Sequence, residues 1–144
     1  MRRTNGGGVG RFVLQIIPMF RPEIIATSSG PAIVHAGDSS PVVTAKPAKA
    51  GEILTLFATG LGPTRPGVDP GQPFTRDPLQ VVNSPVQVLV NGKASDALYA
   101  AGFPGTTDQY WVDFQLPAGT SSGQTSIQVS SAWILGPTVS IPVQ

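Results

Sequence analysis

Gly51-Glu-Ile-Leu-Thr-Leu-Phe-Ala-Thr-Gly-Leu-Gly-Pro63 is the segment from which the fold class of this chain can be predicted. Seven residues with strand-forming character lie between an opening glycine and a sharp Gly-Leu-Gly-Pro stop. In an extended chain, alternate residues face opposite sides, so Phe57 and Thr55 face one side while Leu54 and Leu56 face the other. Because both sides are fairly apolar, the segment is predicted to be a central strand covered on both faces.

Shorter runs on the C-terminal side of this segment also have strand-forming character. Asn91-Gly92 lies between two strand-like runs, residues 85–90 and 93–101, and Asn-Gly is the favoured two-residue turn of a β-hairpin. Residues 109–116 alternate cleanly, which places Trp111 on the outward side of its strand. Residues 125–130 and 138–143 are predicted to form a last pair of strands.

No stretch of ten residues has a convincing helical pattern. The sequence therefore predicts an all-β fold, a β-sandwich of about 7–9 short, mainly antiparallel strands. The side chains expected in its core are Phe57, Val88, Val112, Phe114, Ile127 and Ile141.

Composition agrees with a single folded domain. The 144 residues include 17 glycines and 15 prolines, and only 12% are charged, but 40% are hydrophobic and fall in short alternating runs that disordered chains lack. The absence of cysteine excludes disulfides, thiol catalysis and cysteine-ligated zinc. A net charge of +1 supplies no field for nucleic acid, and no apolar run reaches the roughly 20 residues of a membrane helix. Neither a nucleic-acid partner nor a membrane span is expected.

The N-terminal part differs from the rest of the chain. Residues 1–11 are predicted to be a flexible basic lead, and residues 12–30 to be a strand and linker from a preceding region. The apolar run of residues 12–17 is shorter than the roughly 7–15 residues of a signal-peptide core, and no small-residue cleavage site follows it. We therefore expect no signal peptide in this chain and a domain that spans residues 31–144.

Four segments together resemble one uncharacterised domain family: residues 47–63, 86–93, 98–102 and 110–117. This family is found at the C-terminus of many secreted proteins of acidobacteria and is similar to immunoglobulin-like IPT/TIG domains. The resemblance spans about residues 31–144. It implies an immunoglobulin-like β-sandwich in the C-terminal part of a longer polypeptide, located outside the cell or on its surface. The family has no catalytic residue that could be carried over to this chain.

The residue types that carry chemistry are sparse. His35, the only histidine, has no second histidine or cysteine near it in sequence and is expected to be a partly buried structural residue. Asp69 and Asp77 share a proline-rich loop but lack the clustered acids of a calcium site. No Gly-x-Ser-x-Gly motif is present, and Pro63 removes a backbone N–H that a phosphate loop would need. The sequence thus predicts no catalytic, cofactor-binding or metal-binding residues, and no enzyme.

Residues that could recognise a partner are easier to find. The loop of residues 62–78 is unusually long and combines Arg65, Phe74 and Arg76 with five prolines. Trp111 and Trp133 are expected near the surface, where aromatic rings grip sugars or proteins. The favoured function is a non-catalytic structural or protein-interaction module of an exported bacterial protein, with an unknown protein or glycan partner. The alternatives are a carbohydrate-binding module that uses exposed aromatic residues and, second, a hydrolase.

Overall fold

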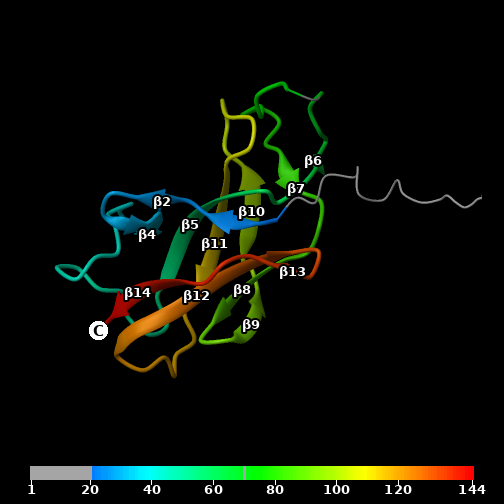
Figure 1. Ribbon diagram of the computed structural model, residues 1–144. Helices are drawn as coiled ribbons and strands as arrows, with labels where there is room; N and C mark the ends of the chain where they lie inside the picture. The colour runs from blue at the N-terminus through cyan, green and yellow to red at the C-terminus, as the bar shows by residue number, and fades with distance from the viewer. Residues whose placement is uncertain (1–20, 70) are drawn as a thin grey trace, which may run out of the picture.

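A computed structural model describes residues 21–69 and 71–144 of the chain. In these residues it contains fourteen strands and no helix (Figure 1). The predicted all-β fold is confirmed, and the strand number exceeds the expected 7–9 because six strands are only two residues long. The predicted flexible lead and the predicted strand at residues 12–17 lie outside the described residues.

The larger sheet has seven strands and is antiparallel throughout. Its centre is β5 (Ile53–Thr59), the strand predicted from the opening segment, paired with β11 (Tyr110–Gln115). The remaining members are β1 (Glu23–Ile24), β4 (Ile33–His35), β6 (Thr64–Arg65), β7 (Val81–Val82) and β10 (Tyr99–Gly102).

Two separate short strands, β1 and β4, pair along one edge of β5. β1 pairs with the C-terminal end of β5 and β4 with its N-terminal half. Between them the chain leaves the sheet as a small ribbon of β2 (Ala26–Thr27) and β3 (Gly30–Pro31). The sheet therefore includes residues upstream of position 31, where the sequence placed the domain boundary.

The second sheet has five strands and packs against the first. Its longest strand, β12 (Gly123–Ser131), pairs on one side with β8 (Val86–Val90). Its other members are β9 (Lys93–Asp96), β13 (Ile134–Leu135) and β14 (Val139–Val143). In Figure 1 the strands β12 and β14 run across the direction of β5, β11 and β10.

The core lies between the two sheets. Five of the six side chains predicted to be buried there are buried: Val88, Val112, Phe114, Ile127 and Ile141. The prediction was wrong for Phe57, which lies half-buried on the opposite face of β5. Leu54, Leu56 and Ala58 form the core-facing side of that strand instead. With two apolar faces on one strand, alternation alone cannot tell which face meets the second sheet.

The hairpin prediction is confirmed, but the run that follows it is divided between the sheets. Asn91 and Gly92 have φ values of 53° and 81° and connect β8 to β9. The predicted strand at residues 93–101 is two strands: β9 pairs with β8 in one sheet, and β10 pairs with β11 in the other. The chain crosses between the sheets at Ala97 and Leu98. The Ala97 N–H donates to the backbone carbonyl of Val86, and the Leu98 N–H donates to the backbone carbonyl of Asp113.

Candidate functional site

A buried amide links several points of the long loop of residues 62–78, which contains the short strand β6 at one end of the sandwich. Gln80, 1% exposed, accepts hydrogen bonds at Oε1 from the Thr64 hydroxyl (3.0 Å) and the Gly67 N–H (2.6 Å). Its Nε2 donates to the Thr75 hydroxyl at 2.7 Å. One side chain therefore links three points of the loop, so the loop follows a defined path despite its length.

Phe74 holds the same loop from the inside. Its ring is 6% exposed and packs on Tyr110, with ring centroids 5.1 Å apart. It also lies directly over Gly102, where any Cβ would overlap the ring. Phe74 was predicted to contribute to a recognition surface, but the structure places it beneath the loop, whereas Arg65 and Arg76 are exposed.

The loop walls a hollow of about 560 Å³ against the turn that joins β10 to β11. In Figure 1 this loop rises above β7 beside that turn. Asp69 and Gln72 line the hollow from the loop, Asp108 lines it from the turn, and Phe74 and Tyr110 form apolar parts of its wall. No basic side chain is among its described lining residues. The hollow thus combines aromatic surface with two carboxylates.

Two of these residues are fixed by hydrogen bonds. Asp108 accepts from the Gly60 N–H at 3.1 Å, and the Tyr110 hydroxyl donates to the Gly62 carbonyl at 2.7 Å. Burial, together with the nearby Asp108 carboxylate, raises the pKa of Tyr110 to about 12. The phenol therefore stays protonated at neutral pH and keeps its bond to the loop.

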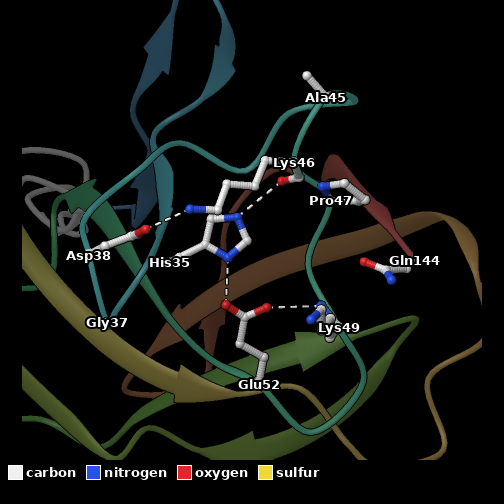
Figure 2. Close-up of a pocket in the computed structure, with 9 residues that line it drawn as sticks. All are labelled: His35, Gly37, Asp38, Ala45, Lys46, Pro47, Lys49, Glu52 and Gln144. Carbon is white, nitrogen blue, oxygen red and sulfur yellow. Dashed lines mark hydrogen bonds and ion pairs between the residues drawn. The ribbon is translucent and has the colours of Figure 1, made fainter.

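A second hollow, of about 510 Å³, surrounds His35 (Figure 2). His35 is 6% exposed, as expected of a structural histidine. Its Nδ1 lies 2.5 Å from Glu52 Oε2, and its Nε2 lies 3.0 Å from the Lys46 carbonyl oxygen. Glu52 Oε1 also accepts from the Lys49 N–H at 2.9 Å. The three groups thus tie the loop of residues 36–52 to β4.

The partners of the two ring nitrogens limit the chemistry that His35 can perform. The Lys46 carbonyl is an acceptor for Nε2, and the Glu52 carboxylate is the partner of Nδ1. Both ring nitrogens are therefore engaged. In a serine–histidine–acid triad the second nitrogen would face a hydroxyl, but here it faces the backbone of Lys46.

The rim of the same hollow carries an exposed ion pair. Lys46 Nζ donates to Asp38 at 2.5 Å and to the Ser40 hydroxyl at 2.8 Å. The hydrogen bond from Lys46, and to a smaller extent those from Ser40, hold the pKa of Asp38 well below its usual range. Lys46 and Asp38 on the rim of the hollow are therefore paired with each other.

The two tryptophans belong to different sheets. Trp111, half-buried, lies on the outer face of β11 among Phe57, Tyr99 and Phe103. Phe103 meets Trp111 edge-on at 85°, and Tyr99 is tilted from it by 37°. Trp133 is 70% exposed at the tip of the turn between β12 and β13. Trp133 is not among the rings that contact Trp111.

Several residues of the two hollows belong to no sequence motif and could not have been predicted from one. Gln80, Asp108 and Glu52 are single polar residues, and each has at least one hydrogen-bond partner that lies 13 to 48 positions away in the sequence. The one usable signal was the loop length that singled out residues 62–78. In the described residues, no group of three or more His, Cys, Asp or Glu side chains could hold a metal ion, and Asp69 and Asp77 form no such group.

Comparisons with known proteins add no relative. No protein-family model matches the chain, and no curated protein or solved structure is similar enough to count as a match. Within the part of the chain that the structure describes, no helix is long and apolar enough to cross a membrane.

Proposed function

We propose that this chain is a non-catalytic protein-interaction module of an exported bacterial protein, and that it holds its partner at the hollow beside the loop of residues 62–78. The export assignment rests on the resemblance of residues 31–144 to domains of secreted proteins. The binding assignment rests on the site itself, because fold alone does not define function.

The observation that carries this proposal is the fixed path of the loop. An ordinary connection is only about 2–6 residues long, whereas this one is closed over Gln80 and Phe74 and walls a hollow. A loop that is ordered before binding loses little entropy when a partner arrives. The exposed carboxylates Asp69 and Asp108 favour a partner group that donates hydrogen bonds.

The test compares isosteric variants on a peptide array and a glycan array. Asp69→Asn/Asp108→Asn removes both charges from the hollow and keeps the Asp108 oxygen that accepts from Gly60. Glu23→Gln/Asp77→Asn is the matched control, because it removes two exposed carboxylates outside the hollow. We expect peptide binding by the parent and the control, and at least a tenfold loss of affinity in the Asp69/Asp108 variant.

Arg65→Ala/Arg76→Ala forms a further arm, because the sequence singled out these two arginines. Binding that depends on the arginines alone would move the recognition surface to the outside of the loop. No binding by the parent on either array would leave structural spacing as the function.

The carbohydrate-binding alternative is supported by one observation, the exposed ring of Trp133. Sugar-binding faces usually present flat aromatic rings for stacking, but the rings around Trp111 interlock edge to face. Binding on the glycan array that is lost in Trp133→Ala would favour this alternative.

The hydrolase alternative is tested directly with general ester, glycoside and peptide substrates. We expect no turnover, because both ring nitrogens of His35 are engaged.

A further inference from the structure

The second sheet carries almost no charge. Residues 114–144 contain no Lys, Arg, Asp, Glu or His, and they supply its strands β12, β13 and β14. β8 is also uncharged, so the charged residues of this sheet are Lys93 and Asp96 of β9, at its edge. A soluble surface typically has about 25–35% charged residues, and depletion of charge is a compositional mark of binding interfaces.

The outer face of this sheet presents amides and hydroxyls. Alternate residues of β12 from Thr125 to Val129 are buried toward the core, so Gln124, Ser126 and Gln128 lie on the opposite face. Ser140 of the neighbouring strand β14 pairs directly with Ser126 (Figure 1). Gln124 and Ser140 are exposed, and Ser126 and Gln128 are half-buried. The four side chains form an uncharged hydrogen-bonding surface across two adjacent strands.

The surroundings of this surface change its character little. Leu89 of β8 and Pro142 of β14 pair with residues of the β12 row, and both are half-buried. Asp96, at the β9 edge, is the charged residue on this side of the sheet, and its carboxylate accepts from Gln87 Nε2 at 3.1 Å. Amides and hydroxyls therefore dominate the middle of the face, and the charge lies at its border.

The surface is held in place before any partner arrives. Gln128 Nε2 donates to the Gly136 carbonyl at 3.1 Å, which fixes the orientation of this amide. The Ser126 N–H donates to Asn91 Oδ1 at 3.1 Å, and the strand around it is hydrogen-bonded on both sides. A preorganised surface loses little entropy on binding.

We propose that the face formed by Gln124, Ser126, Gln128 and Ser140 binds a neutral polysaccharide. Sugar hydroxyls donate and accept hydrogen bonds, and amide and hydroxyl side chains match them in both roles. A charged partner would give up hydration for a face that offers few counter-charges, and an apolar partner would leave the amides unsatisfied. This face is separate from the loop hollow, and the inference does not depend on what that hollow binds.

The test is a ¹⁵N–¹H titration of the full chain with cello-, manno- and xylo-oligosaccharides, with oligogalacturonate as the charged comparison. Gln124→Glu/Ser140→Asp places two charges on the face. Ser95→Asp/Gln109→Glu is the matched control, with the same two exchanges at exposed positions elsewhere. Ser95 pairs with the buried Val88 and so points to the other side of the sheet, and Gln109 lies on the turn before β11.

We expect at least one neutral oligosaccharide to shift the side-chain amide resonances of Gln124 and Gln128 in the parent and in the control. Its affinity should fall at least fivefold in Gln124→Glu/Ser140→Asp, with the Trp111 indole resonance unchanged as the sign of an intact fold. Oligogalacturonate should cause no shift at these amides.

Three results would overturn the proposal. The first is that none of the neutral oligosaccharides shifts these amides, or that the shifts are confined to the loop hollow or to Trp133. The second is equal binding of oligogalacturonate at the face. The third is a dimer in sedimentation velocity that is lost in Gln124→Glu/Ser140→Asp, because a second copy of the chain would then cover the face.

Discussion

Gln80 is a buried amide on which the candidate site depends. Gln80→Leu would keep the side-chain volume but leave the Thr64 hydroxyl and the Gly67 N–H without their acceptor. Leaving buried polar groups unsatisfied costs about 1–3 kcal/mol, so we expect a loss of that size in urea unfolding. Hydrogen exchange at the Gly67 amide should also accelerate. Unchanged exchange at Gly67 would mean that the loop does not need this residue.

The raised pKa of Tyr110 predicts that the protein loses stability at alkaline pH. Its pKa is about 12 in the folded chain and about 10 in an unfolded one, so the folded state favours the protonated phenol. Its contribution to stability is complete below pH 10 and is lost as the pH rises from 10 to 12, because only the unfolded chain ionises there. We expect the melting temperature to fall more steeply over this range in the parent than in Tyr110→Phe. Parallel curves would contradict the shifted pKa.

At the scale of elements, two tight turns both have positive φ values at their two central residues, but substitutions in them are expected to have opposite effects on stability. Gly92, at φ 81°, suits its turn, and Gly92→Val should destabilise by about 1–2 kcal/mol because a β-branched residue resists positive φ. Ala132, at φ 49°, does not suit its turn. Because asparagine tolerates this region, Ala132→Asn should stabilise by up to about 1 kcal/mol. Both values come from urea unfolding, and a stabilising Gly92→Val or a destabilising Ala132→Asn would show that other contacts dominate these turns.

How far the sequence predicts the elements depends on how local their causes are. The Asn91-Gly92 turn and the alternation in β11 were predictable because each is set by neighbours in the chain. The assignment of β9 and β10 to different sheets was not, because residues 93–101 contain no glycine or proline to mark the point between β9, which pairs with β8, and β10, which pairs with β11. Phe57 shows the same limit, since its exposure depends on which face of β5 the second sheet covers.

At the scale of the whole molecule, the loop of residues 36–52 joins the two sheets. It begins after β4 of the larger sheet, and its Ala48 forms a parallel bridge to Val143 of β14 in the smaller sheet. The Ala48 N–H donates to the Pro142 carbonyl at 3.0 Å, and the Gln144 N–H donates to the Ala48 carbonyl at 2.7 Å. Such a connection could not be predicted from sequence, because it joins an ordinary loop residue, Ala48, to the end of a strand about 95 positions away.

The imidazole of His35 is expected to hold this inter-sheet connection in place. His35→Phe removes the contacts to Glu52 and to the Lys46 carbonyl, and hydrogen bonds to charged groups contribute about 1.5–3 kcal/mol, so the free energy of unfolding should fall by that amount. Lys46→Ala is the matched control. It keeps the carbonyl that His35 contacts and removes only the exposed contacts of the Lys46 ammonium with Asp38 and Ser40, so its free energy of unfolding should stay within the scatter of the measurement. Amide exchange at Ala48 and Gln144 should accelerate in His35→Phe alone. If Lys46→Ala lost as much stability and protection, the exposed pair rather than the buried ring would hold the sheets together.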